Sequence, residues 1–280
     1  MKTVRFEGAG VTLAADVAGD PSAPPILFMH GGGQTRHSWG RAARIAAERG
    51  FRSISIDLRG HGESDWAPDA AYGLDQYAAD ARAVITAIGR PAAIVGASLG
   101  GLTGLIVAGE SDPPLANALV LVDVTPRIEQ EGTSEIRAFM NGAPNGFATL
   151  EEAAAAVSAY LPHRPRPTSA EGLLKNLRLG EDGRYRWHWD PAMNKAVGPA
   201  NMLHQRDRLD AAARNLAIPT LLVRGGISKV VSQQSVDEFL ALAPHAHYIN
   251  VAGADHMVAG DRNDAFNDAV FQFLDSTLTA

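Results

Sequence analysis

Ser98 lies within Gly96-Ala97-Ser98-Leu99-Gly100, a G-x-S-x-G pattern that is followed by one more glycine. A serine hydroxyl is a poor nucleophile until a positioned base takes its proton. Small residues on both sides of the serine permit a tight, strained turn between a strand and a helix, which holds Oγ above a sheet. The pattern therefore predicts Ser98 as the nucleophile of an acyl transfer. A glycine-rich packing turn is the alternative interpretation.

A second glycine-rich stretch, His30–Gly33, directly follows the apolar run Ile26–Met29. Acyl transfer needs two N–H groups that stabilise the oxyanion, one from the residue after the nucleophile and one from a loop of this kind. We assign these donors to Leu99 and Gly32, with the neighbouring glycines of the loop as alternatives for the second. Gly33 is predicted to line the substrate site, and the histidine of the loop to brace it.

The general base is predicted to be His256. Among the 9 histidines it is the one that follows the last predicted strand, Ala246–Val251, which places it at the same sheet edge as Ser98. The chain order nucleophile, acid, histidine is the order of the architecture in which a nucleophile turn of this kind occurs. His245 and His247 flank the start of that strand, and we interpret them as structural.

The elements that position these residues alternate along the chain. Short apolar strands are separated by amphipathic or small-residue helices, which predicts an α/β fold with a mostly parallel sheet covered on both faces. The alternation stops after residue 124 and returns near residue 209. We therefore predict a core of residues 1–124 and 209–280, and a helical cap of residues 125–208 over the carboxyl ends of the strands, where ligands bind in open α/β sheets.

Three segments in this order resemble the α/β-hydrolase superfamily: 26–64, which contains Asp57-Leu58-Arg59-Gly60-His61-Gly62-Glu63-Ser64, then 96–101, and 253–256. The resemblance covers the chain outside the insertion. It implies about eight strands, a helical cap after the sixth strand, and a Ser-acid-His triad in a serine esterase-like member. In such proteins the segment 57–64 shapes the sheet edge and is not usually catalytic.

The triad acid departs from this pattern. Proteins of this kind usually carry an aspartate in a stretch G-x-x-S-D-x-x-S after the seventh strand, and here Lys229 occupies its place within residues 225–232. A lysine cannot accept a hydrogen bond from His256, and a cation nearby would lower the histidine's pKa.

Asp123, at the end of the sixth predicted strand, is our candidate for the acid. The resemblance supports this position, because haloalkane dehalogenases place the acid there. Asp255 ranks lower, since side chains of sequence neighbours generally cannot face each other. The remaining interpretation is that the acid is missing and the enzyme is weak or degenerate.

Phe139, Phe147 and Trp187 of the insertion are predicted to line an apolar substrate pocket, although each fits the cap's own core equally well. The predicted substrate is a small or medium apolar ester or lactone. A carbon–carbon bond hydrolase or a perhydrolase would use the same serine. A ligand-binding or sensing protein on a hydrolase scaffold is the alternative of a different class.

The amino-acid composition excludes several other classes of function. The 25 basic and 31 acidic residues give a net charge of −6, which offers no electrostatic footprint for nucleic acid or an anionic membrane. The chain has no cysteine, so disulfides and thiolate metal sites are excluded. We expect no cofactor and no metal, and a cytoplasmic location. The oligomeric state is not predicted.

Overall fold

The computed structural model describes residues 1–162, 169–195, 199–252 and 264–278, with the side chains of 194, 195 and 199–204 excepted. An eight-stranded sheet forms the centre, in the order β1-β2-β4-β3-β5-β6-β9-β10. β1 and β2 are antiparallel to their neighbours, and the other strands are parallel. The predicted α/β fold class is confirmed. The strands of this sheet are β1 (Lys2–Glu7), β2 (Thr12–Ala18), β3 (Pro25–Met29), β4 (Arg52–Ile56), β5 (Ala92–Ala97), β6 (Ala116–Val122), β9 (Thr220–Gly225) and β10 (His247–Val251).

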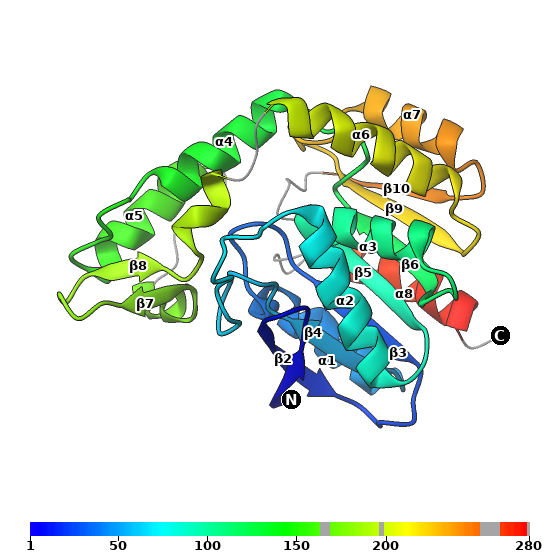
Figure 1. The fold of residues 1–280 in the computed structure, drawn as a ribbon, viewed down its shortest axis with the longest axis horizontal. Coiled ribbons are helices and arrows are strands. Elements are labelled where there is room, and N and C mark those ends of the chain that lie inside the picture. Colours follow the sequence, from blue (N-terminus) through cyan, green and yellow to red (C-terminus); the bar gives the residue numbers. More distant parts are fainter. Residues whose placement is uncertain (163–168, 196–198, 253–263, 279–280) are drawn as a thin grey trace.

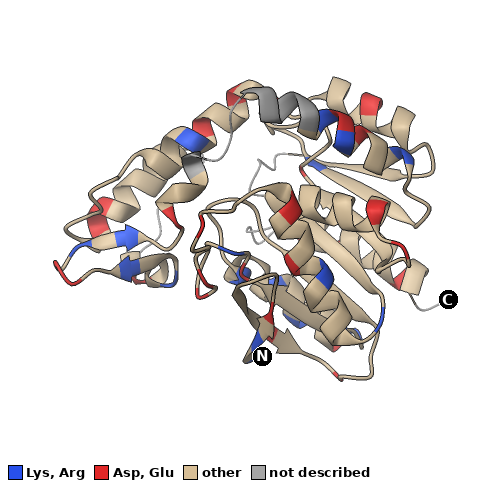
Figure 2. Ribbon diagram, in the orientation of Figure 1, with Lys and Arg blue, Asp and Glu red and all other residues tan. Residues whose placement is uncertain are grey.

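Helices cover both faces of the sheet (Figure 1). α1 (Gly40–Glu48) and α8 (Asp264–Leu278) pack on one face, where Trp39 and Phe271 are fully buried. α2 (Leu74–Ile88), α3 (Leu99–Glu110) and α7 (Gln233–Leu242) pack on the other. Because both faces are covered, the central strands are apolar along their whole length. Acidic and basic residues are interspersed on the helices and loops instead (Figure 2).

The insertion forms a cap beside the sheet edge (Figure 1). It contains α4 (Gln130–Asn141), α5 (Leu150–Tyr160), two short 3-10 helices (Ala170–Asn176 and Pro191–Lys195) and a hairpin of β7 (Leu177–Leu179) and β8 (Tyr185–Trp187). Phe147, Trp187 and Trp189 are buried together in its own small core. The cap is thus a separate hydrophobic cluster with its own packing.

The chain returns to the sheet through α6 (Pro199–Arg214), which runs through position 208, where the sequence suggested a boundary. The second half of α6 contributes Leu209, Ala212 and Ala213 to the main core. At Gly109 of α3 an added Cβ would lie 2.3 Å from the Ala212 carbonyl oxygen, so glycine permits the close approach of α6 to α3. One helix therefore spans from cap to core.

Candidate active site

Ser98 joins β5 to α3 in a strained turn, with φ 47° and ψ −114°. A positive φ is costly for a residue with a Cβ and persists only where the surroundings enforce it. The glycines of the motif provide the space: a Cβ at Gly96 would lie 2.4 Å from the Gly100 oxygen, and one at Gly100 would lie 2.3 Å from the Met29 oxygen. The G-x-S-x-G pattern is therefore a packing requirement of this turn.

The glycine loop after β3 lies against this turn. A Cβ at Gly31 would be 3.3 Å from the Ser98 Cβ. Gly31 N–H donates to Gln34 Oε1 at 3.2 Å, and Gly33 N–H donates to His61 Nε2 at 3.2 Å. Within the described part of the chain, Gly32 N–H has no acceptor. As far as the described residues show, the Gly32 N–H is thus available to a ligand.

The second predicted donor, Leu99, is the first residue of α3, so its N–H has no acceptor within the helix. The positive end of the helix dipole lies at the same place and favours negative charge there. Leu99 and Gly32 both line the cavity that contains Ser98.

Two buried histidines hold the glycine loop. His30 Nε2 accepts from Leu58 N–H at 3.0 Å, so Nδ1 carries the proton and donates to the Gly31 oxygen at 2.8 Å. His61 Nδ1 donates to the Arg59 oxygen at 3.0 Å. Burial lowers the pKa of His30 to about 4 and that of His61 to about 3, so both rings are neutral at pH 7. His30 therefore braces the loop, as the sequence suggested.

Asp123 follows β6 directly and has a φ of 49°. Its carboxylate is fully buried and accepts hydrogen bonds from Gly225 N–H at 2.9 Å and Ser228 Oγ at 2.5 Å. Ala97 and Val122 are register partners on adjacent parallel strands, so the next residues, Ser98 and Asp123, leave the sheet side by side. His256 and Asp255 lie outside the described residues.

Lys229 extends toward the cap. Its Nζ lies 2.6 Å from Glu135 Oε1 and 3.6 Å from Glu131 Oε1, both on α4. The hydrogen bond with Glu135 raises the pKa of the lysine. Gly132 permits this approach, because a Cβ there would lie 2.6 Å from the Lys229 oxygen. Lys229 is absent from the described lining of the cavity, so its charge is directed away from Ser98.

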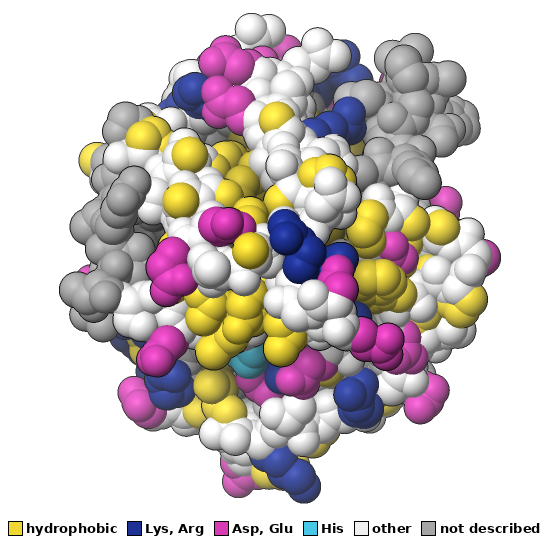
Figure 3. Space-filling model, turned by 90° about the vertical axis from the view of Figure 1, so that its left-hand side faces the viewer, with side chains coloured by type: hydrophobic (Ala, Val, Ile, Leu, Met, Phe, Trp, Pro, Cys, Tyr) yellow, Lys and Arg dark blue, Asp and Glu magenta, His cyan; other side chains and the backbone are white. Residues whose placement is uncertain are grey.

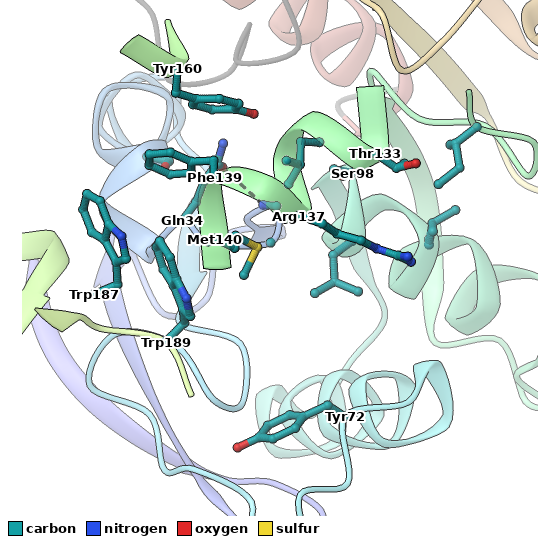
Figure 4. A pocket seen from close by; sticks show the side chains of 18 of the residues that line it. Gln34, Tyr72, Ser98, Thr133, Arg137, Phe139, Met140, Tyr160, Trp187 and Trp189 are labelled. Carbon is teal, nitrogen blue, oxygen red and sulfur yellow. Dashed lines mark hydrogen bonds between the residues drawn. The ribbon is translucent and has the colours of Figure 1, made fainter. Parts of the chain in front are cut away.

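The cavity lies between the sheet edge and the cap and has a volume of about 570 Å³. Figure 4 shows its cap wall, in which Phe139, Met140 and Trp187 lie near one another. Aromatic pairs form much of this wall: the rings of Phe139 and Tyr160 stack with centroids 4.3 Å apart, and those of Trp187 and Trp189 with centroids 5.0 Å apart. On the outer face that carries the cap, hydrophobic side chains gather between charged ones (Figure 3).

The predicted lining residues divide into two groups. Gly33, Phe139 and Trp187 line the cavity as expected from the sequence. Phe147 is absent from the described lining: its ring packs edge-on against Trp187, with centroids 5.2 Å apart, and its backbone pairs with Tyr185. Phe147 thus belongs to the core of the cap and supports the wall from behind.

Several lining residues were not predicted from the sequence. Thr133, Ile136, Arg137 and Met140 share one face of α4, and Arg206 comes from α6. The i, i+3, i+4, i+7 spacing on α4 could have suggested a common face. Nothing in the sequence says that this face turns toward Ser98, because that depends on how the cap packs.

The fold and this site define a hydrolase of the α/β class. The family model described as "alpha/beta hydrolase fold" matches residues 24–262, and the chain belongs to this family. It is 34% identical over 265 residues to the esterase Rv0045c of Mycobacterium tuberculosis, covering 91% of this chain and 84% of that protein. It is 31% identical over 259 residues to 2-(acetamidomethylene)succinate hydrolase of Mesorhizobium japonicum, covering 91% and 89%.

Solved structures agree with this assignment. A crystal structure of E-2-(acetamidomethylene)succinate hydrolase superposes with a TM-score of 0.85 at 28% identity, covering 98% of this chain and 99% of that one. A structure of the M. tuberculosis esterase gives a TM-score of 0.76 at 29% identity, covering 98% and 92%. Among the described helices, none has both the length and the apolar character of a membrane span.

Proposed function

We propose that this protein is a serine hydrolase that cleaves a carboxylic ester or lactone through an acyl-enzyme on Ser98. The observation that carries the proposal is the strained Ser98 turn at the wall of an apolar cavity, with the Gly32 N–H beside it and without an acceptor among the described residues. Strain of this kind is typical of functional sites. The names of the relatives support ester hydrolysis.

In the proposed reaction, His256 takes the proton of Ser98 Oγ as Oγ attacks the substrate carbonyl carbon. The carbonyl oxygen becomes an oxyanion, which Leu99 N–H and Gly32 N–H stabilise. Collapse breaks the bond to the alcohol oxygen, which receives the proton from His256. Water then attacks the acyl-enzyme with the same base, releasing the acid and restoring the serine.

We assign the acid of the triad to Asp123. A triad acid must be an ionised carboxylate that holds the histidine in one tautomer and stabilises its protonated form. Asp123 occupies the strand end next to Ser98, and its oxygens accept from Gly225 N–H and Ser228 Oγ, which fix the position of the carboxylate. At the position where relatives usually carry the triad acid, this chain has Lys229, which cannot fill that role. Its ammonium group forms an ion pair with Glu135 of α4 instead.

A fluorophosphonate probe tests the nucleophile. The expected result is a single covalent adduct on Ser98, found by mass spectrometry, together with hydrolysis of 4-nitrophenyl butyrate. Ser98→Ala should abolish labelling and lower kcat by about five to six orders of magnitude, as removal of a triad serine does elsewhere. Labelling at another residue, or an unchanged rate in the variant, would overturn the proposal. Binding of a hydrophobic ligand without labelling would favour a sensing protein.

A further inference from the structure

The charged residues that line the cavity are basic, whereas the protein as a whole has a net negative charge. The chain carries a formal charge of −6, yet among the described residues that line the cavity the charged ones are Arg137 and Arg206. No Asp or Glu is found in that described lining. The rest of the wall is apolar or uncharged, and the two arginines are exposed residues. They therefore present positive charge to a ligand that enters the cavity.

Arg137 has no partner of its own among the described residues. It extends from α4 into the cavity (Figure 4). The described structure gives its guanidinium no hydrogen bond and no ion pair. The acids on the same helix, Glu131 and Glu135, are engaged by Lys229. An arginine that faces an apolar cavity without a carboxylate is poised to bind an anion.

Other arginines of the same region contrast with it. Arg127 pairs with Asp210 and Glu238, and Arg208 pairs with Glu110 and Asp75. Arg206 shares α6 with Arg208, but it lines the cavity and is exposed. Its guanidinium has no hydrogen bond in the described part of the chain, although its charge lowers the pKa of Glu238. Arg206 is therefore a second source of positive potential, partly offset by Glu238.

We propose that the substrate carries a carboxylate, which Arg137 binds while Ser98 attacks a carbonyl elsewhere in the same molecule. This rests on the proposed function. Arg137 presents a planar fork of donors that matches a carboxylate, and Arg206 adds to the field. The stacked pairs Phe139–Tyr160 and Trp187–Trp189 offer apolar surface for the remainder of the substrate. The substrate class is thus an amphiphilic ester or lactone with one acidic end.

Two matched pairs of esters test this proposal. In the first the carboxylate is on the acyl side: 4-nitrophenyl hydrogen adipate against its neutral methyl ester, whose long spacer limits self-catalysed hydrolysis. In the second it is on the alcohol side: 4-butyryloxybenzoic acid against its methyl ester. The wild-type protein should prefer the acid in one pair by about tenfold or more in kcat/KM, the size expected of one charge-assisted hydrogen bond.

Arg137→Gln should remove that preference, lowering kcat/KM for the acid by about tenfold and leaving the neutral ester within about twofold. Arg137→Lys should restore part of it. Arg186→Gln is the matched control, because Arg186 is a cap arginine that pairs with Asp182 and does not line the described cavity. Calorimetry of the preferred acid with Ser98→Ala should show the same loss of affinity when Arg137→Gln is added.

The outcomes separate the two proposals. One outcome overturns the carboxylate proposal alone. In it, the neutral esters are hydrolysed in a way that depends on Ser98, but the acid is not preferred in either pair. An equal effect of Arg137→Gln on acid and neutral ester also overturns it. Hydrolysis that persists in Ser98→Ala, or the absence of hydrolysis and of labelling at Ser98, overturns the proposed function itself.

Discussion

The sheet edge beneath Ser98 and the cap above it are built by different means. At the edge, backbone groups hold the reactive positions: Gly100 N–H donates to the His30 oxygen at 3.2 Å, and Asp123 N–H donates to the Val223 oxygen at 2.7 Å. In the cap, aromatic rings and one face of α4 form the wall, together with the Arg137 guanidinium, which has no partner among the described residues. Backbone geometry tolerates few residue types, whereas a wall of side chains can change with little effect on the fold.

Hydrogen bonds join the two regions mainly along one segment. Gly62 N–H donates to His188 Nδ1 at 2.7 Å, and Asp190 N–H donates to the Gly60 oxygen at 2.9 Å. The Tyr72 hydroxyl donates to Asp190 as well. Other links include the hydrogen bond from Glu129 N–H to the Val230 oxygen at 2.8 Å and the ion pair of Lys229 with α4, which is exposed. The comparison therefore predicts large effects for changes at the edge and small ones for changes at the exposed link.

The largest effect after Ser98 itself is expected at Asp123. Asp123→Asn keeps the shape of the side chain but removes the charge that would stabilise a protonated His256. We expect kcat for ester hydrolysis to fall by about a hundredfold or more, since loss of a triad acid elsewhere costs about 10⁴-fold. Circular dichroism should show an unchanged fold. An unchanged kcat would remove Asp123 from the triad.

A loss of stability in mild acid should come from the buried histidines. His30, His61 and His188 are neutral in the folded protein because burial lowers the pKa of each. In the unfolded chain they take up protons below pH 6.5, so the free energy of unfolding falls as the pH drops from 6.5 toward 4. At pH 5 His30 and His61 each contribute a loss of about 2 kcal/mol relative to pH 7.5, at about 1.4 kcal/mol per pKa unit. His188 acts in the same direction.

Urea unfolding at pH 7.5, 6 and 5 measures this loss. His61→Gln keeps a hydrogen-bond acceptor near Gly33 but does not titrate, so its slope with pH should be smaller. His247→Gln is the control, because His247 is exposed on β10 and its removal should leave the slope unchanged. Equal slopes in all three proteins would contradict the assignment.

The smallest effect is expected at Lys229. Lys229→Gln removes an exposed ion pair, and pairs of this kind contribute little. We expect kcat/KM to stay within about twofold of the original protein. Lys229→Asp should not raise kcat if Asp123 already serves as the acid, and it adds a third carboxylate next to Glu131 and Glu135, so the melting temperature should fall. A marked gain in kcat for this variant would mean that the triad lacks its acid.

The sequence predicted the edge better than the cap, for a physical reason. The Ser98 turn and the His30–Gly33 loop require glycine at fixed positions, so the requirement is visible in the residue types. The face of α4 that carries Arg137 depends on tertiary packing, which residue types alone do not specify. The short hairpin β7–β8 was missed as well, since each strand has only 3 residues and neither is a buried apolar run.

His188 lies on the same segment of the cap as the Trp187 and Trp189 rings and holds Gly62, next to His61, which in turn holds Gly33. The aromatic wall of the cavity and the loop that presents Gly32 are thus joined by a chain of hydrogen bonds through two histidines. If the proposed function holds, this chain links the distance between the wall and the Gly32 N–H to the folding of the cap. The length of a substrate would then be selected by the packing of the cap against the loop.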